Sequence, residues 1–477
     1  MKKQIYPVFI CLCSLLLAGC NNSGGGNSLP DDKDPNYYSE NGDWRVFDTA
    51  SDLNINESFA GGLNDSVWYT LEGSWHTEDT TAPHNGMKNR NLFYVHDGDE
   101  DYLAIRGRGI YNKDSDFEYN KPEGGCIITQ KHLGPGRYEI EMAAMPRRGG
   151  VSTMWTYCTT TGSEATSQNE IDIELGGTTK GTQFEHEWCT TWTTHTTKAT
   201  DTVDVTDIAY LNDGQIHKFT FDWYTNYAGT GEKRVDWFLD GILIDTLTGN
   251  IVPDHSTPLW IGLWFPPLWA GMPTFEEDYM LVRNISFTAF TAEQYYDDCR
   301  SQPGYNKKLP SASNIQTIEM SKIKNVNKLS NTDFESLDIA PRDESYYGWL
   351  LEDVSKGNVE LSNESTKGSR SFKINAGEDG GTYLDQELSN AYTGYKYHLS
   401  IDAKLSDSTS KGNIEIYMKS KTGKDLSTKL LNVTSTSFTT LEYDITMPED
   451  ASSLLVCLTA EKGSVLYDNA SLTYLGL

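Results

Sequence analysis

The chain has 477 residues and a formal net charge of −29, and it contains 41 glycines, 27 tyrosines and 12 tryptophans. This length allows two domains with large cores. The negative charge disfavours nucleic acid and other polyanions as partners, because proteins bind them through basic patches. Short strand-like runs recur between Gly, Asn, Asp and Ser without a sustained helical period, so an all-β protein is expected.

The first residues follow a pattern typical of an exported protein. Met1 and two lysines precede a short apolar run, which ends in Leu17-Ala18-Gly19-Cys20. These features describe a secretory signal, and its cysteine resembles a bacterial lipobox. The apolar run of residues 5–18 is shorter than the roughly 20 residues that a membrane-spanning helix needs. We expect a signal peptide at residues 1–19, lipidation of Cys20 and a flexible tether at residues 20–43.

These expectations place the protein at the bacterial outer membrane or cell surface as an exported lipoprotein. The lipid anchor would be its only contact with the membrane.

Three carboxylates alternate with two isoleucines in Glu170-Ile171-Asp172-Ile173-Glu174. A period of two predicts a β-strand with the acids on one face and the isoleucines on the other. Repeated like charges on one face repel, so such a row is costly without a function. The alternative is a solvated acidic strand face, which would not explain the aromatic residues nearby.

This row suits glycoside hydrolysis. The Cα atoms of Glu170 and Glu174 would lie roughly 13 Å apart on a regular strand. On a concave sheet, their carboxyl groups lean together toward the roughly 5–5.5 Å separation of a retaining glycosidase. One would be the nucleophile and the other the acid/base, in an order that spacing alone leaves open. Asp172 can hydrogen-bond to one neighbour and help hold the other protonated.

The motif Asn169-Glu170-Ile171-Asp172-Ile173-Glu174 resembles the signature of glycoside hydrolase family 16, whose members are retaining endo-β-glycanases with a β-jelly-roll fold. The resemblance implies that Glu170 is the nucleophile, Asp172 its helper and Glu174 the acid/base. It extends from about Trp44 to Ala292. Five further segments carry it, namely residues 134–142, 150–157, 217–223, 235–241 and 263–271.

The regular spacing of the acids resembles the licheninase and xyloglucan-active branch, since laminarinase-like members carry an extra residue between the last two acids. Two departures leave the sugar specificity open. Residues 184–192 keep only a loose likeness to licheninases, and Gly262 stands where a polar cleft residue is expected.

Aromatic side chains are candidates for sugar binding, because the apolar face of a pyranose stacks on a flat ring. Trp264 and Trp269 are favoured as platforms, because residues 265–268 read as a loop that would present them. Each candidate has a position in the core as its alternative. The full set expected around the cleft is Trp155, Tyr157, Trp188, Trp192, Trp264 and Trp269.

A break in the strand pattern follows the first domain, where Gln302-Pro303-Gly304 and residues 309–314 interrupt it. We expect the catalytic domain at residues 44–300, a polar linker or edge at 301–328 and a second β-sandwich at 329–477. Residues 331–335, Trp349 and residues 467–474 resemble the opening and closing strands of jelly-roll carbohydrate-binding modules. The alternative is a β-sandwich spacer without binding of its own.

Five cysteines follow the lipid site, and their odd number leaves at least one unpaired within the chain. A pair among Cys126, Cys158 and Cys189 is plausible, with Cys299 and Cys457 as the remaining two. No cysteine or histidine spacing indicates a metal site. No cofactor is expected, although the resemblance includes members that bind a structural calcium.

The resemblance therefore implies an all-β chain, with a concanavalin-like β-jelly-roll sandwich followed by a smaller β-sandwich. It also implies that the chain hydrolyses internal β-linkages of a polysaccharide. The leading substrates are mixed-linkage β-glucan and xyloglucan. An endo-β-galactanase, a transglycosylase and a catalytically silent glycan-binding protein are the alternatives.

Overall fold

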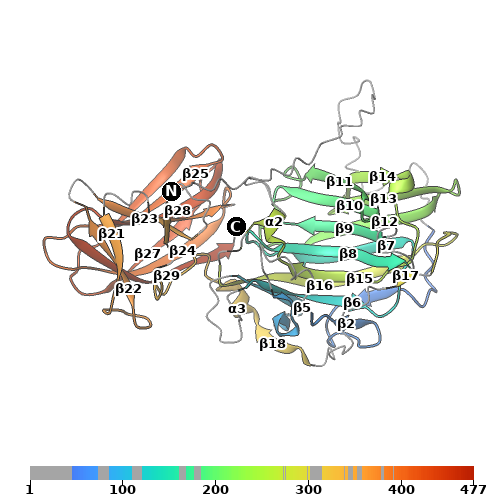
Figure 1. Cartoon of the computed structure of the whole chain (residues 1–477), viewed down its shortest axis with the longest axis horizontal. Coiled ribbons are helices and arrows are strands. Elements are labelled where there is room, and N and C mark those ends of the chain that lie inside the picture. Colours follow the sequence, from blue (N-terminus) through green and yellow to red (C-terminus); the bar gives the residue numbers. More distant parts are fainter. Residues whose placement is uncertain are drawn as a thin grey trace, which may run out of the picture.

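The computed structural model shows two β domains side by side, the larger one first (Figure 1). It describes residues 46–73, 85–109, 121–160, 168–176, 184–271, 273, 275–297, 299–300, 314–337, 339–341, 348–351, 357–377, 381–389 and 391–476. The expected signal peptide, Cys20 and the tether lie outside these residues. Within them, no helix has the length and apolarity needed to cross a membrane.

The first domain is built from two sheets. The one that carries the acidic motif, called here the site sheet, has the order β2 (Trp68–Thr70), β6 (Glu123–Thr129), β15 (Leu259–Trp264), β8 (Val151–Thr160), β9 (Gln168–Leu175), β10 (His186–Thr194) and β11 (Thr197–Asp204). The back sheet has the order β18 (Gln316–Glu319), β4 (Leu92–Asp97), β5 (Glu100–Arg108), β16 (Glu277–Ala289), β7 (Gly136–Ala143), β12 (His217–Tyr227), β13 (Glu232–Leu239) and β14 (Ile242–Thr248).

Short elements complete this domain. They are β1 (Ile55–Glu57) beside β16, β3 (Gly86–Met87) beside β6, β17 (Cys299–Arg300) beside β8, the helices α2 (Pro267–Ala270) and α3 (Met320–Lys324), and the 3-10 turns Asn89–Asn91 and Gly249–Ile251.

The core of the first domain lies between the site sheet and the back sheet. Ile171 and Ile173 of β9 enter it fully buried, together with Phe221 of β12 and Trp237 of β13. Alternation along β9 therefore places its isoleucines in the core and its acids on the opposite face. This confirms the expected all-β sandwich and the predicted orientation of the acidic strand.

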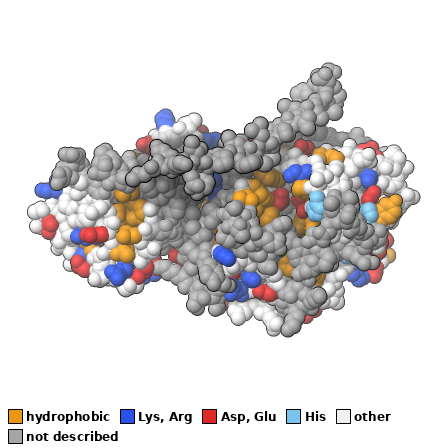
Figure 2. Space-filling model, in the orientation of Figure 1, with side chains coloured by type: hydrophobic (Ala, Val, Ile, Leu, Met, Phe, Trp, Pro, Cys, Tyr) orange, Lys and Arg blue, Asp and Glu red, His pale blue; other side chains and the backbone are white. Residues whose placement is uncertain are grey.

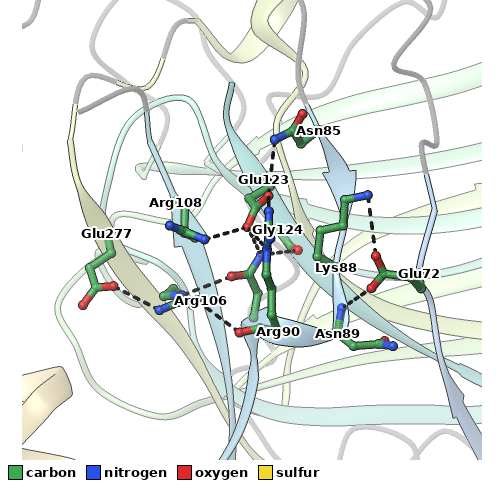
Figure 3. Close-up of polar contacts among 11 residues, drawn as sticks. Glu72, Asn85, Lys88, Asn89, Arg90, Arg106, Arg108, Glu123, Gly124 and Glu277 are labelled. Atoms are coloured by element: carbon green, nitrogen blue, oxygen red, sulfur yellow. Dashed lines mark hydrogen bonds and ion pairs between the residues drawn. The ribbon is translucent and has the colours of Figure 1, made fainter. Parts of the chain in front are cut away.

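Strand β6 belongs to the site sheet but also reaches β5 of the back sheet, and a buried ionic cluster marks this junction (Figure 3). Glu123 has no exposed surface and accepts two hydrogen bonds from Arg90, at 2.9 and 2.7 Å. Arg108 and Asn91 donate to the same carboxylate. Burial raises the pKa of Glu123, but these donors outweigh burial and hold the pKa below its usual range. The cluster has a structural role at the strand junction.

The segment expected as a linker or edge is partly built into the first domain. Residues 316–319 form β18, a parallel edge strand beside β4. Met320 and Val326 pack in a buried cluster with Val95 and Tyr279 of the back sheet. The chain thus leaves the first domain only after covering the outer face of β4, β5 and β16.

The second domain is a smaller β-sandwich. One sheet has the order β19 (Ile339–Pro341), β20 (Trp349–Leu351), β23 (Thr382–Ser389), β28 (Ala451–Ala460), β25 (Asn413–Ser420) and β26 (Asp425–Asn432). The other has the order β21 (Gly357–Ser362), β22 (Ser371–Ala376), β29 (Ser464–Gly476), β24 (Lys396–Leu405) and β27 (Thr439–Thr446).

Phe334, Trp349 and Tyr467 are fully buried in the core of this second domain. Tyr467 belongs to the last strand, as expected. Residues 331–335 differ from the expectation, because they form turns in which Asn331 and Phe334 have positive φ angles, rather than an opening strand.

The cysteine pairing differs from the prediction. Cys158 of β8 forms a disulfide with Cys299 of β17, whereas Cys126 and Cys189 are buried with free thiols, as is Cys457 in the second domain. The prediction failed because it paired cysteines close in sequence. The two cysteines of the disulfide are 141 residues apart in the sequence. They meet because β17 pairs with the end of β8.

Candidate active site

The three acids lie on one face of β9, near the middle of the site sheet. Glu170 and Glu174 are partly exposed, whereas Asp172 between them is only 3% exposed. The indole N–H of Trp237 donates to the backbone oxygen of Asp172 at 3.1 Å, so the centre of the strand is fixed from the core side. The geometry gives the two glutamates access to a ligand and makes Asp172 a buried neighbour of both.

Strand β10 places a tryptophan opposite each glutamate. Trp188 is in register with Glu174, and Trp192 is in register with Glu170. Residues directly opposite in an antiparallel pair point to the same face. Both indoles therefore share the face of the acids, and both are partly exposed.

Strand β8 contributes Trp155 opposite Asp172 and Tyr157 opposite Glu170. They also share the face of the acids, but their rings are buried, at 4% and 8% exposure. They pack in an apolar cluster with Trp260 of β15, whose ring centroid lies 5.5 Å from that of Trp155 and 6.1 Å from that of Tyr157. The structure thus places Trp155 and Tyr157 beside the acids on the same face, as buried packing rather than as open sugar platforms.

Three of the expected aromatic residues converge at the end of β9 that bears Glu174. Trp269 stacks on Trp188 with ring centroids 5.1 Å apart, and Trp264 meets Trp269 edge to face at 5.8 Å. Trp264 ends β15, and Trp269 lies in α2, so a short helical turn presents it where a loop was expected. Figure 2 shows hydrophobic side chains beside acidic ones at the level of α2 and β9.

Gly262 also lies on this face, opposite Thr153 of β8 and Cys126 of β6. A Cβ atom at this position would lie 2.9 Å from the backbone oxygen of Gly125 and 3.0 Å from the Cβ atom of Cys126. Close strand packing therefore explains why a glycine replaces the polar residue that was expected.

Burial raises the pKa values of all three acids, and the charge of Glu174 adds to the rise for Glu170. Burial is the largest cause in each case, and it raises the pKa of Glu170 to about 8 and that of Glu174 to about 7. The charges of both glutamates raise the pKa of Asp172 still further above its usual range. The three carboxyls titrate together, because a proton gained by one changes the charge that the other two meet.

The hydrogen bonds indicate where the charge sits within this group. A hydrogen bond between Asp172 and Glu170 raises the pKa of Asp172 and lowers that of Glu170. This hydrogen bond favours a proton on Asp172 over one on Glu170. The side-chain amide of Gln168 also donates to Glu170. Two donors thus favour the ionised form of Glu170 against its burial.

Lys198 of β11 completes the electrostatics of the site. It is in register with Trp192, and its ammonium lies 4.6 Å from the centroid of that ring. Its charge lowers the pKa values of Glu170 and Glu174. The sequence analysis missed Lys198, because nothing in the pattern of residues 197–204 pointed to a strand beside the acids. Gln168 was also missed, although it precedes Glu170 by two residues and so shares its face.

The part of the chain that the structure describes holds no group of three or more His, Cys, Asp or Glu side chains placed to bind a metal ion. His217 lies between Asp213 and Asp240. Burial lowers the pKa of His217, but hydrogen bonds to these two carboxylates outweigh burial and raise it to about 9.

Two family models match the chain. Residues 99–279 match the model of "Glycosyl hydrolases family 16", and residues 326–464 match a "Carbohydrate binding domain". The first range includes β9, and the second covers most of the smaller sandwich.

Curated relatives match the first domain. The chain is 30% identical over 146 residues to a "Beta-glucanase" of Paenibacillus polymyxa, an alignment that covers 30% of this chain and 54% of that protein. It is 31% identical over 163 residues to a "Xylanase/beta-glucanase" of Ruminococcus flavefaciens, covering 34% of this chain and 18% of that protein. The chain spans about half the length of the first of these relatives.

Solved structures are also similar. A Bacillus licheniformis β-glucanase is 21% identical with a TM-score of 0.39, and the alignment covers 49% of this chain and 97% of the other. A family 16 protein of a Bacteroides ovatus mixed-linkage glucan locus, solved with a product, is 14% identical with a TM-score of 0.40, covering 49% and 99%.

Proposed function

We propose that this chain, which contains a glycosyl hydrolase family 16 domain followed by a carbohydrate binding domain, is a retaining endo-β-glucanase. The observation that carries the proposal is the row of three coupled carboxyls on β9, with Trp188 and Trp192 opposite the two glutamates. Acids supply the chemistry of glycoside cleavage, and aromatic rings bind the apolar faces of sugars. A merely solvated acidic face would need neither the buried Asp172 nor the paired indoles.

The first step forms a glycosyl-enzyme. The carboxylate of Glu170 attacks the anomeric carbon, while Glu174 donates its proton to the departing glycosidic oxygen. The bond from the anomeric carbon to the leaving sugar breaks as the bond to Glu170 forms. The raised pKa of Glu174, about 7, keeps the proton available near neutrality.

In the second step, the ionised Glu174 takes a proton from water, and the water oxygen attacks the anomeric carbon. This attack releases Glu170 as a carboxylate and completes hydrolysis with retention. Asp172 acts by holding a proton that it shares with Glu170 through a hydrogen bond, which stabilises the charge whenever Glu170 is free.

The substrate class follows from the relatives. The similar curated proteins are named as β-glucanases, and the regular spacing of Glu170, Asp172 and Glu174 matches the licheninase and xyloglucan-active branch. Mixed-linkage β-glucan is therefore the proposed substrate, with xyloglucan second. β-Galactans are the next class to test.

The experiment is a screen of the purified chain on mixed-linkage glucan, xyloglucan, laminarin and agar, with the products identified by mass spectrometry. We expect internal cleavage of a β-glucan, and NMR of the first product should show the β-anomer. Glu170→Gln should lower the rate by about ten-thousand-fold or more while leaving the circular dichroism spectrum unchanged. Products longer than the substrate would indicate transglycosylation instead. An α-anomer or an active Glu170→Gln variant would contradict the proposal.

Further parts of the proposal concern regions beyond the active site. We propose that the second domain binds the polysaccharide, that Cys20 anchors the chain to a bacterial membrane by a lipid, and that the enzyme acts at the cell surface. Binding of glucan by the full-length Glu170→Gln variant, but not by a form that lacks residues 329–477, would support a binding role for the second domain. The anchor is tested by growing cells with radiolabelled palmitate. The label should be incorporated into the wild-type chain but not into the Cys20→Ala variant. We propose that the reaction needs no cofactor. Calorimetric unfolding before and after treatment with a chelator tests for a structural calcium.

A further inference from the structure

The second domain contacts the first through side chains that are specific and partly buried. Lys421, in the turn between β25 and β26, binds both carboxylate oxygens of Glu185, at 3.1 and 2.9 Å. Glu185 is nearly buried, with a side chain 8% exposed, whereas Lys421 is 69% exposed. The pair therefore joins an exposed cation of one domain to a buried anion of the other.

Aromatic contacts lie beside this ion pair. Tyr210 of the first domain stacks on Tyr392 of the second with ring centroids 3.9 Å apart and ring planes 15° apart. Tyr210 also packs against the core of the second domain. The hydroxyl of Tyr474 donates to the backbone oxygen of Asp213 at 2.9 Å. The first domain thus offers two adjoining segments, residues 184–185 and 209–213, which we call the docking segments.

The docking segments are attached to the active site. Leu211 donates a backbone hydrogen bond to Phe184, and Val205 donates one to Glu185, each at 2.9 Å. β10 begins at residue 186, directly after Glu185. Two residues further, Trp188 lies opposite Glu174 and stacks on Trp269. A displacement of Glu185 would therefore move the start of β10, the strand that carries Trp188 opposite Glu174.

A second contact fixes the domains where the chain passes between them. Asp278 of the back sheet is 2% exposed and pairs with Lys328 and, at 3.8 Å, with Arg147. Arg147 also donates to the backbone oxygen of Asn327 at 3.2 Å. Because a buried ion pair is broken only at high cost, this joint resists bending. Together with the docking segments, it holds the second domain at two separate places.

We infer that the second domain is a fixed part of the catalytic unit, and that its contact with the docking segments positions β10 so that Trp188 forms a sugar-binding wall beside Glu174. This inference rests on the proposed function. Domains of one chain ordinarily move relative to each other unless extensive contacts hold them together. Here the stacked tyrosines, the pair of Lys421 with Glu185 and the buried pair of Lys328 with Asp278 hold the second domain at two separate places. A freely tethered binding module would instead leave the cleft independent of the second domain.

The test uses full-length variants and a soluble β-glucan oligosaccharide too short to reach a second binding site. Lys421→Glu places a like charge beside the nearly buried Glu185, so it should push the domains apart. We expect KM to rise by about threefold or more, with kcat and the pH profile near wild type, because sugar stacking on Trp188 is lost and the acids are untouched. Lys421 is largely exposed, so the substitution leaves both cores intact.

Two variants control for other effects of the charge. Lys424→Glu makes the same change in the same turn, at an exposed residue whose backbone bonds to Ser420 of that turn, and should leave KM unchanged. The double variant Lys421→Glu/Glu185→Lys exchanges the two charges. It should restore much of the affinity for the oligosaccharide, because the ion pair between these positions is formed again. Equal effects of Lys421→Glu and Lys424→Glu would overturn the inference.

A readout independent of activity is the thermal unfolding of the same variants by calorimetry. We expect the two domains of the wild type to unfold together, and those of Lys421→Glu to unfold in two separated transitions. An unchanged KM for Lys421→Glu on the oligosaccharide would overturn the inference, even if the variant lost activity on polymer. Failure of the wild type to cleave any β-glucan would instead contradict the proposed function, whereas the calorimetric result would still report on docking.

Discussion

At the scale of single residues, the chemistry of the site depends on how protons are distributed among three neighbouring carboxyls. Asp172 is buried between two glutamates and has the strongest bias toward its neutral form. Gln168 favours charge on Glu170 alone, whereas Lys198 favours charge on both glutamates and burial opposes it on both. The arrangement therefore separates one carboxylate for attack from another that can carry a proton.

Glu174→Ala should lose most activity on polysaccharide but keep more on an aryl glucoside, because a good leaving group needs little protonation. Added azide should restore turnover and give a β-glycosyl azide, detectable by NMR. In the wild type, activity on polysaccharide should fall at alkaline pH, because the coupled carboxyls then lose the proton that Glu174 must donate. An α-configured azide would contradict double displacement through Glu170.

Asp172→Asn and Asp172→Ala should differ. The amide of asparagine can still donate a hydrogen bond to Glu170, whereas alanine cannot, so kcat should fall more in the alanine variant, by about tenfold relative to asparagine. Steady-state kinetics on the verified glucan would measure this difference. Equal rates for the two variants would show that the donated hydrogen bond has no part in the reaction.

Lys198→Met should move the whole pH profile toward higher pH. Lys198 lowers the pKa values of Glu170 and Glu174, so its removal raises both. Glu170 would then ionise, and Glu174 lose its proton, only at higher pH, which shifts the acidic and the basic limbs in the same direction. Lys198→Arg keeps the charge over Trp192 and should keep the profile. A shift of only one limb would mean that Lys198 acts on one glutamate alone.

At the scale of elements, three strands and a short helix together form the face that would bind sugar. β9 supplies the acids, β10 the opposing indoles, β8 the buried support, and α2 presents Trp269. Strand register decides which side chains lie opposite one another. A shift of this register by one residue would therefore remove every aromatic partner from the acidic face.

Trp269→Ala should raise KM for a β-glucan oligosaccharide by about threefold to tenfold with a smaller effect on kcat. It removes one ring from the contact with Trp188 and Trp264, and stacked aromatic contacts of this kind contribute roughly 1 kcal/mol each. Leu268→Ala is the matched control, because Leu268 lies in the same helix and its side chain is 72% exposed. Equal effects would point to disruption of α2 rather than loss of a sugar platform.

The elements also show what sequence could and could not predict. Period-two alternation was enough to orient Glu170, Asp172 and Glu174, because that pattern is local. The disulfide and the burial of Trp155 depend on which strands become neighbours, and a single sequence does not encode that pairing locally. For the same reason Lys198 was missed, since only the register of β11 with β10 brings it to the site.

At the scale of the whole molecule, the segment expected as a linker or edge supplies an edge strand and apolar cover to the first domain. A form that ends at residue 300 lacks β18, Met320 and Val326, and it uncovers Val95 and Tyr279 of the back sheet. We expect it to be less stable than a form that ends at residue 328 by roughly 2–5 kcal/mol, from the lost burial of two apolar side chains. Urea unfolding of both forms would measure the difference. Equal midpoints would show that the segment is only a linker.

The placement of β18 and α3 also bears on how such a chain can be recombined during evolution. A gene fusion that joined the catalytic sandwich to a new partner at the break after residue 300 would leave the covering strand with the donor domain. A productive crossover has to fall beyond Val326, where the covering segment has ended. Even a crossover at that point would separate the first domain from Lys328 and from the tyrosines that contact the docking segments. The two domains are therefore expected to be inherited as a pair rather than exchanged as independent modules.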